Sequence, residues 1–248
     1  MRAGHYFDLV RSLPIGDWRD LTDEKPFVVI SPHPDDESLG AGGLIALARR
    51  YRQEAVVILL TDGSGSHPKS RDYPRERLIQ TRRSELREAA QVLGLTSNHL
   101  HELGLPDTAA PTAGPTFDKT AQAISDIVTK MQARSLFVTW KFDPHCDHEA
   151  AALLAEQVRR QSPDLKLWAY PIWGWHLSPS AQLIAPIPHG MKLAIDQVME
   201  QKRAAIDAHR SQMGSLISDD PNGFCFTDET LKPFLQPYEY FIEVPTQQ

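Results

Sequence analysis

The chain has 248 residues, of which 41% are hydrophobic and 23% are charged, and its formal net charge is -6. This composition is typical of a folded globular protein with a full core and excludes a disordered chain. The negative net charge argues against a nucleic-acid partner, because binding to a phosphate backbone depends on clustered Lys and Arg. The apolar runs are too short to cross a bilayer, so we expect no membrane span.

The length and the cysteine content favour one intracellular domain. An α/β protein of this size can fold around one sheet, so we predict a single domain over residues 1–248, with 1–25 as an N-terminal lead segment. The two cysteines, Cys146 and Cys225, are too few for the disulfide framework of a small secreted protein. The N-terminal residues lack the uninterrupted apolar stretch of a signal peptide. We therefore predict a cytoplasmic protein.

Strands and helices are predicted to alternate along the chain. The apolar, β-branched run 27–30 is typical of a strand buried on both faces of a parallel sheet, and Pro32 and Pro34 end it in a loop. Further strands are predicted at 55–60, 98–103, 136–140, 165–170 and 238–244, and helices at 42–51, 75–94, 117–131, 147–160 and 192–209. The predicted fold class is α/β, with a three-layer, mostly parallel, Rossmann-like sheet and helices on both faces.

Two clusters of histidine and acidic residues follow predicted strands. Residues 31–37 read Ser-Pro-His-Pro-Asp-Asp-Glu and come directly after the first strand. Residues 143–149 read Asp-Pro-His-Cys-Asp-His-Glu and follow the strand at 136–140. Because ligands of open α/β sheets bind beyond the carboxyl ends of the strands, we expect the two clusters to face one another there.

The residue types in these clusters are those of a catalytic metal site. Catalytic zinc takes three protein ligands and keeps one position for water, and His33, Asp36 and His148 would supply that set. Bound zinc lowers the pKa of its water towards about 7, and Asp35 is the candidate base beside it. The same ligand types accept Fe²⁺ or Co²⁺ as well as Zn²⁺, so the identity of the metal stays open.

Both clusters match the motifs of a known family. The chain resembles the PIG-L/LmbE-like zinc-dependent N-acetylglucosamine deacetylases, whose signature reads His-Pro-Asp-Asp-Glu near the N-terminus and His-x-Asp-His later. The resemblance extends through residues 60–63, Arg82-x-x-Glu85, 103–107 and 202–212. One departure is Cys146, which stands where many relatives carry proline, and its role stays open.

The resemblance implies an LmbE-like fold and an amide hydrolysis. It implies metal ligation by His33, Asp36 and His148, and it makes Asp35 the general base that later protonates the leaving amine. The predicted function is therefore a metal-dependent N-deacetylase, and its partner is a small-molecule N-acetylated amino-sugar conjugate such as a glucosamine conjugate.

The resemblance also implies supporting residues around the metal. A protonated His145 would stabilise the oxyanion, since fixed positive charge helps where negative charge develops. Arg82 and Asp107 would contact the substrate. Asp147 would hold an imidazole by hydrogen bonding to its outer nitrogen, and the sequence leaves open which histidine it serves.

Local alternatives exist for each motif. The acids at 35–37 could simply cap the following helix, but three adjacent acids beside a histidine repel one another without a cation. His145 and His148 could be a surface pair at a helix start. Residues 40–43, with Asp62, faintly imitate a dinucleotide fingerprint, but Ile45 occupies the third glycine position. A nicotinamide-dependent oxidoreductase is therefore the weaker alternative.

Other classes of function and several details stay open. A catalytically silent, metal-stabilised sugar-binding module would use the same pocket, whereas a metal phosphoesterase would need a second cluster of ligands that the sequence does not show. Trp173 and Trp175 could form a pocket wall or pack in the core. The sequence names neither the acceptor nor the oligomeric state, and a homo-oligomer stays among the options.

Overall fold

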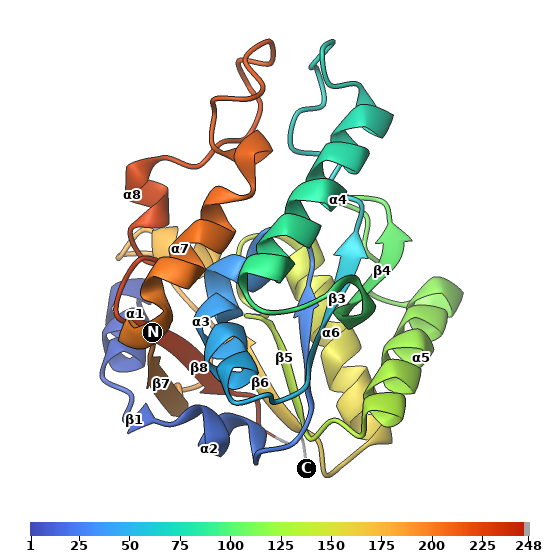
Figure 1. Cartoon of the computed structure of the whole chain (residues 1–248). Helices are drawn as coiled ribbons and strands as arrows, with labels where there is room; N and C mark the ends of the chain where they lie inside the picture. Colours follow the sequence, from blue (N-terminus) through green and yellow to red (C-terminus); the bar gives the residue numbers. More distant parts are fainter. Residues whose placement is uncertain (246–248) are drawn as a thin grey trace.

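An eight-stranded sheet crosses the molecule in the order β1-β7-β8-β6-β5-β2-β3-β4 (Figure 1). The computed structural model describes residues 1–245. The strands are β1 Ile15–Gly16, β2 Phe27–Ser31, β3 Ala55–Thr61, β4 Leu100–Leu105, β5 Ser135–Thr139, β6 Lys166–Tyr170, β7 Gly190–Ala194 and β8 Tyr238–Glu243. Neighbouring strands are parallel except where β8 runs antiparallel to β6 and β7. The prediction of a mostly parallel sheet is confirmed.

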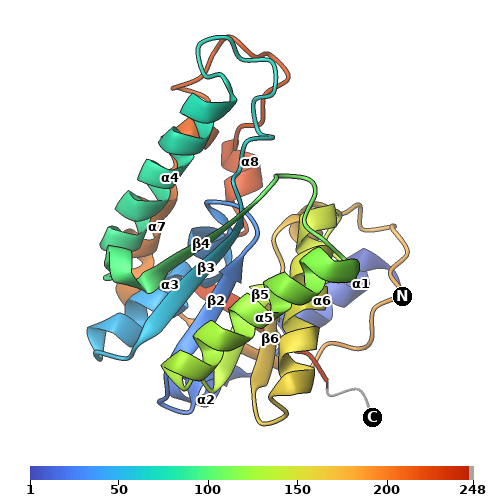
Figure 2. The same cartoon turned by 90° about the vertical axis from the view of Figure 1, so that its right-hand side faces the viewer.

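Helices cover both faces of this sheet and complete the three predicted layers (Figure 2). One face carries α3 Asp36–Arg50, α4 Arg75–Val92 and α7 Met199–Asp207, and the other carries α5 Gly114–Met131 and α6 Cys146–Gln161. Shorter elements are α1 Ala3–Arg11, α2 Trp18–Thr22 and α8 Asp228–Leu231, with 3-10 turns at Ser97–His99, Trp173–His176, Asp196–Val198 and Arg210–Gln212. Within residues 1–245, no helix is long and apolar enough to cross a bilayer.

The central strands are buried on both faces, as their composition predicts. Side chains alternate along a strand, so Phe27 and Val29 of β2 join the core beneath α3, whereas Val28 and Ile30 join the core beneath α5 and α6. Because every position of β2 is buried, both faces of the strand carry apolar residues up to Ile30, and only its last residue, Ser31, is polar. The first polar cluster therefore begins where the core stops.

Helix α3 begins at Asp36, so the prediction of a start at residue 42 was wrong. The glycines at 40, 42 and 43 lie inside this helix, where they permit close packing. A Cβ at Gly40 would lie 2.0 Å from the Tyr170 ring, and one at Gly43 would lie 2.5 Å from Ile195. The acidic side chains of Asp36 and Glu37 also suit the first turn, because helix N-termini carry partial positive charge.

The prediction of a single helix over residues 192–209 was also wrong for the residues before Met199. Residues 190–194 form β7, which pairs in parallel with β1 and antiparallel with β8, and α7 starts only at Met199. Pairing with distant strands decides the local structure here. The remaining predicted strands and helices are confirmed with shifts of a few residues at their ends.

The N-terminal segment 1–25 packs onto the sheet. Tyr6, Phe7 and Val10 of α1 are buried, and the Tyr6 ring stacks on Trp140 with 5.0 Å between ring centroids. Trp18 of α2 joins the core beneath α3. These contacts support the far edge of the sheet.

A buried ion pair ties α3 to α7 and β8. Lys202 Nζ donates to Glu239 Oε1 at 2.7 Å and to the Leu39 carbonyl at 2.8 Å. Glu239 also accepts hydrogen bonds from the backbone N–H groups of Gly43 and Leu44 inside α3. Both side chains are almost fully buried, so each charge depends on the other.

We predict that Glu239→Gln lowers the free energy of unfolding by about 3 kcal/mol, because it leaves the Lys202 ammonium buried without a counter-charge. Urea unfolding followed by circular dichroism measures the change. The matched control is Asp8→Asn, which removes the exposed Arg11–Asp8 pair and should leave the urea midpoint unchanged. Equal midpoints for the two variants would refute this account of the buried pair.

Candidate active site

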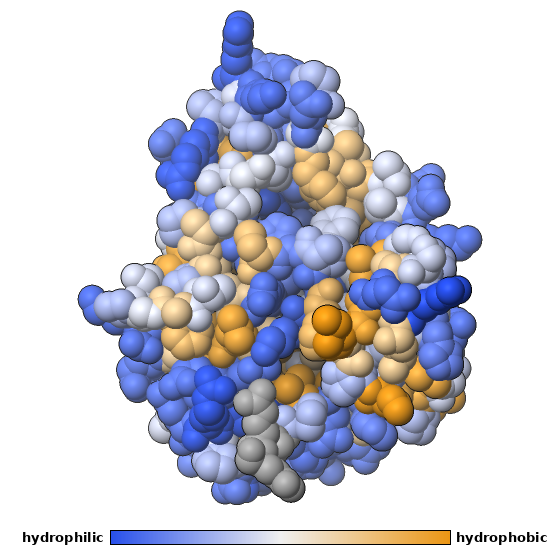
Figure 3. Space-filling view, turned by 180° about the vertical axis from the view of Figure 1, so that it is seen from behind, coloured by the Kyte–Doolittle hydropathy of each residue, from blue (hydrophilic) through white to orange (hydrophobic). Residues whose placement is uncertain are grey.

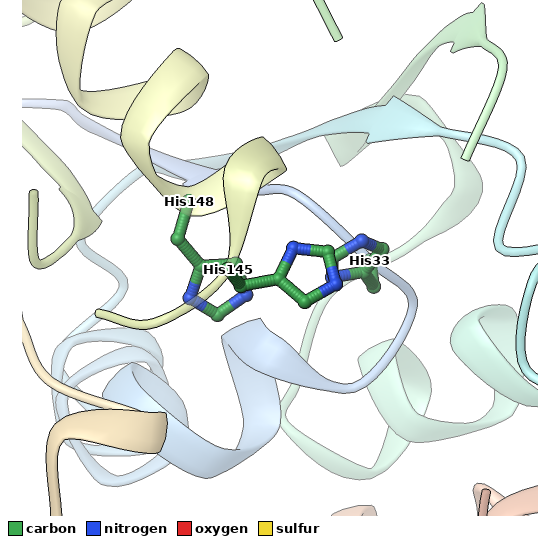
Figure 4. A group of neighbouring side chains, drawn as sticks. All are labelled: His33, His145 and His148. Carbon is green, nitrogen blue, oxygen red and sulfur yellow. The ribbon is translucent and has the colours of Figure 1, made fainter. Parts of the chain in front are cut away.

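The two polar clusters meet at the carboxyl ends of β2 and β5, which are neighbours in the sheet. His33 lies on the loop after β2, whereas His145 caps α6 and His148 lies in its first turn. Figure 4 shows the three imidazoles converging, and a ring nitrogen from each lies within 4.8 Å of the others. Strands adjacent in space but distant in sequence thus bring together the residues singled out from the sequence.

Asp36 lies between two of these histidines. Its Oδ2 atom is 3.2 Å from His33 Nδ1 and 3.3 Å from His148 Nε2. In a tetrahedral zinc site with bonds of about 2.0–2.1 Å, neighbouring ligand atoms are separated by about 3.3 Å. The distances from Asp36 Oδ2 to the two imidazole nitrogens therefore match the spacing between neighbouring ligands of a small divalent cation.

The hydrogen bonding of the site also fits a cation. Among residues 1–245, His148 Nε2 has no hydrogen-bond partner although it is buried. A buried polar atom without a partner is rare in folded proteins and calls for an explanation such as an ion. His33 also lies within 4.8 Å of Asp107 and Asp147 oxygens, so carboxylates face both of its ring nitrogens.

His33 and His148 each contact a further carboxylate through the ring nitrogen that does not face Asp36. His33 Nε2 is 3.0 Å from Asp147 Oδ2, which answers the question of which imidazole Asp147 serves. His148 Nδ1 is 2.9 Å from Asp143 Oδ2. Such carboxylates fix the tautomer and orientation of a metal-binding histidine.

Asp143 is a functional residue that the sequence analysis missed. It accepts hydrogen bonds from the backbone N–H groups of Ile172 and Gly174 as well as contacting His148. It belongs to the second polar cluster, but its position two residues before the His-x-Asp-His motif gave no local signal of a partner. Its contacts come from the segment after β6, so only the tertiary structure reveals them.

Asp35 is buried beside the histidines and is held by Arg82. Arg82 Nη2 lies 3.1 Å from Asp35 Oδ2, and the guanidinium also donates to the carbonyls of Pro34 and Gly63 at 2.8 Å. Asp35 has a φ of 138°, a strained conformation for a residue with a side chain, which costs about 1–3 kcal/mol. The contacts of Arg82 help to hold this strained loop in place.

The buried charges strongly shift one another's pKa values. Burial lowers the pKa of His33, but hydrogen bonds that the protonated ring donates to Asp107, Asp147 and Asp36 outweigh this and raise it well above its usual range. Burial also lowers the pKa of His148, but Asp36 and Asp143 raise it to about 9. The carboxylates thus create a negative potential that favours positive charge at this point.

The pKa values of Asp36 and Asp35 are shifted in opposite directions. Burial raises the pKa of Asp36, but the charge of His148 outweighs it and leaves the pKa below its usual value. For Asp35, burial raises the pKa to about 7 even though Arg82 lowers it. Neighbouring carboxyl groups with opposite shifts are a common mark of divided roles in an active site.

The environment of His145 favours a neutral ring, whereas the sequence analysis expected a protonated one. Burial and then the charges of His33 and His148 lower its pKa. Its Nδ1 accepts a hydrogen bond from the backbone N–H of Asp147 at 3.2 Å, so the proton of the neutral ring resides on Nε2. A neutral His145 can still donate one hydrogen bond from Nε2.

Residues 202–212, which carry part of the family resemblance, form hydrogen bonds with Glu37 and Glu85 near the site. His209 Nε2 lies 3.2 Å from Glu37 Oε1, and Glu37 in turn accepts from the backbone N–H of Asp35. Glu85 accepts two hydrogen bonds from Ser211, which joins α4 to the turn after α7. His209 is therefore linked through Glu37 to the loop that carries Asp35.

A cavity of about 180 Å³ opens onto the histidines and acids. Its lining residues are His33, Asp35, Asp36, Gly65, Ser66, Arg82, Asp107, Thr108, His145, Trp173, Gln212 and Phe224. Trp173 meets Phe224 edge to face, with 5.4 Å between ring centroids. Trp175 packs against Phe7 in the core instead, at 4.7 Å. Of the two tryptophans considered from the sequence, only Trp173 lines this cavity.

The sequence analysis also missed Ser66, Gln212 and Phe224 as lining residues. The segment that contains Phe224 reaches back over the loop after β3, and its backbone N–H donates to the Ser66 carbonyl at 2.7 Å. Asp219 fastens the same loop by accepting from Ser70 Oγ and from the backbone N–H of Arg71. In Figure 1 the two segments rise together at the top of the molecule.

A larger cavity lies elsewhere and lacks this chemistry. It measures about 680 Å³ and is lined largely by apolar residues of β5, β6, β8 and the segment 186–189. On the face turned away from the viewer in Figure 1, apolar side chains gather in separate patches among polar ones (Figure 3). None of the clustered histidines and acids lines the larger cavity, so we assign the active site to the smaller one.

The fold and the site together define a three-layer α/β protein with a histidine and carboxylate centre at the carboxyl edge of its sheet. Residues 28–159 match the family described as GlcNAc-PI de-N-acetylase (PIG-L). The match covers more than half of the chain, so the chain belongs to the PIG-L family. The resemblance stated from the motifs is confirmed.

Several proteins similar to this chain are named as deacetylases. It is 27% identical over 206 residues to the diacetylchitobiose deacetylase of Thermococcus kodakarensis, covering 77% of this chain and 72% of that protein. It is 24% identical to the "Probable N-acetyl-alpha-D-glucosaminyl L-malate deacetylase 2" of Bacillus cereus, covering 79% and 87%. The N,N'-diacetylchitobiose deacetylase of Pyrococcus horikoshii has the same fold, with a TM-score of 0.67, 22% identity and coverage of 90% and 84%.

We predict that Asp143→Asn weakens zinc binding by about 10-fold to 100-fold, because His148 loses the carboxylate that orients it. Competition with a chromophoric chelator measures the affinity. Asp164→Asn, which changes an exposed acid far from the site, is the matched control and should bind zinc as the wild type does. An unchanged affinity in Asp143→Asn would remove Asp143 from the metal centre.

Proposed function

We propose that this protein is a zinc-dependent hydrolase that removes the N-acetyl group from a small amino-sugar conjugate. The observation that carries the proposal is the position of Asp36 between His33 and His148, with Asp35 beside them at the floor of a cavity. Membership of the PIG-L family supports the reaction type. The relatives named for diacetylchitobiose and for N-acetylglucosaminyl malate support an N-acetylglucosamine-type substrate.

The metal would be held by His33, Asp36 and His148. Two imidazoles and one carboxylate are a common donor set of catalytic zinc, and Fe²⁺ and Co²⁺ accept the same donors. When bound, the cation polarises the amide carbonyl and makes water nucleophilic at neutral pH. Asp147 and Asp143 would keep the two imidazoles oriented towards it.

Asp35 would move the proton in this reaction. It accepts a proton from the attacking water and delivers one to the departing amine, so that water and an N-acetyl amide give acetate and a free amine. Its raised pKa suits a group that must both accept and donate near neutral pH. The ion pair with Arg82 keeps the carboxylate aimed at the cavity.

His145 would stabilise the negative charge that develops on the carbonyl oxygen. Because its Nδ1 accepts from the backbone, its Nε2–H is the group free to donate to an oxyanion. Asp107 and Arg82 line the cavity and would contact substrate hydroxyls. The aromatic side chains of Trp173 and Phe224 would pack against the apolar face of a sugar ring.

We predict that Asp35→Asn lowers kcat for deacetylation by about 100-fold to 10,000-fold and leaves zinc content unchanged, because an amide cannot take up the proton. Release of free amine from N-acetylglucosamine conjugates measures turnover, and elemental analysis measures zinc. Asp118→Asn on the exposed side of α5 is the control and should retain full activity. Wild-type turnover by Asp35→Asn would eliminate the proposed base.

We predict that prolonged dialysis against a chelator abolishes amine release and that one equivalent of zinc restores it, since the cation supplies the electrophile. A panel of diacetylchitobiose, N-acetylglucosaminyl malate and free N-acetylglucosamine identifies the acceptor. Cobalt and ferrous iron are added in parallel to compare the metals. If no conjugate yields amine at any metal loading, a sugar-binding module replaces the hydrolase.

A further inference from the structure

Cys146 lies beside the active site but takes no part in the proposed reaction. It is an exposed, unpaired thiol at the first position of α6. Its Sγ is 3.6 Å from the Thr108 carbonyl oxygen and 3.8 Å from Asp147 Oδ1. Sγ, an Asp147 oxygen and a ring nitrogen of His145 all lie within 4.8 Å of one another. Three side-chain donors thus lie close together, and the Thr108 carbonyl lies next to the thiol.

The spacing of these donors suits a soft divalent cation. Zinc binds sulfur at about 2.3 Å and oxygen at about 2.1 Å, so sulfur and oxygen ligands of one tetrahedral ion are about 3.6 Å apart. The two observed sulfur–oxygen distances are 3.6 and 3.8 Å. Thiolate is the donor that best distinguishes zinc and cadmium from the harder cations magnesium and calcium.

The loop that supplies the carbonyl oxygen is fixed in this position. Asp147 accepts hydrogen bonds from the backbone N–H groups of Thr108 and Ala110, at 2.7 and 3.0 Å. These bonds hold the Thr108 carbonyl near Sγ. The donors are therefore preorganised by contacts that exist independently of any ion.

We propose that His145, Cys146, Asp147 and the Thr108 carbonyl form a second cation site, selective for zinc or cadmium, whose occupation inhibits the enzyme. Binding releases the thiol proton to solvent and forms a metal–sulfur bond. His145 and Thr108 both line the active-site cavity, so an ion held between them takes space that the substrate needs. It also engages the ring that would donate to the oxyanion (Figure 4).

The two parts of this proposal rest on different observations. The binding of the ion follows from the donor geometry alone. The inhibition rests on the proposed deacetylase function and on the place of His145 in it. A spectroscopic measurement therefore tests the first part without any substrate, and an activity measurement tests the second.

The binding test uses cadmium added to protein that already carries one equivalent of zinc. The first site contains no sulfur, so a thiolate-to-cadmium charge-transfer band in the ultraviolet reports only on a cysteine. We expect this band in the wild type and in Cys225→Ala, which lacks the other free thiol, and no band in Cys146→Ala. A band that persists in Cys146→Ala, or no band in the wild type, would overturn the proposal.

The inhibition test titrates cadmium into the deacetylation assay, with each variant normalised to its own activity before addition. Cys146→Ala should need more than about 10-fold more cadmium for half-inhibition than the wild type or Cys225→Ala. Equal inhibition of all three proteins, together with a cadmium band at Cys146, would overturn the inhibitory role alone. If no protein releases amine at any zinc loading, the proposed function fails while the band still decides the site.

Discussion

The site depends on one carboxylate, Asp36, held between two imidazoles that come from distant parts of the chain. Its Oδ2 lies 3.2 Å from His33 Nδ1 and 3.3 Å from His148 Nε2. This contact requires β2 and β5 to be neighbours with their carboxyl ends level, which the parallel register between Phe27 and Ser135 ensures. It also requires α3 to start at Asp36 immediately after the loop. The sheet topology and the close packing of α3 are therefore conditions for the chemistry.

Three groups of the candidate centre each contact a second polar group. Asp147 contacts His33, Asp143 contacts His148 and Arg82 contacts Asp35. Burying this many charges is costly unless they are paired, and in a medium of low polarity each pair is correspondingly strong. The network consequently holds the site rigid, and its residual negative potential is what makes it a suitable place for a cation.

The cavity wall has a separate origin from the centre. The histidines and acids follow β2 and β5, whereas Phe224 and Gln212 arrive from the C-terminal part of the chain and fasten onto the loop after β3. A family can therefore keep the reacting centre and change the wall, because the two belong to different segments. The proposed cation site at Cys146 shares His145 and Thr108 with the lining of the cavity.

Much of the fold and the candidate ligands could be predicted from the sequence alone, because both depend on patterns of residues that are close together in the sequence. The apolar run 27–30 and the helical stripe of 75–94 are local signals, and the motif His-Pro-Asp-Asp-Glu is contiguous. The start of α3 and the strand β7 were predicted wrongly, because packing of Gly40 on Tyr170 and pairing with β8 override local preference. Only the tertiary structure decided that Asp147 contacts His33, that Asp143 contacts His148 and that Phe224 lines the cavity. The residues in those contacts come within hydrogen-bonding or van der Waals distance because of the order of the strands in the sheet. Their spacing in the sequence does not reveal these contacts.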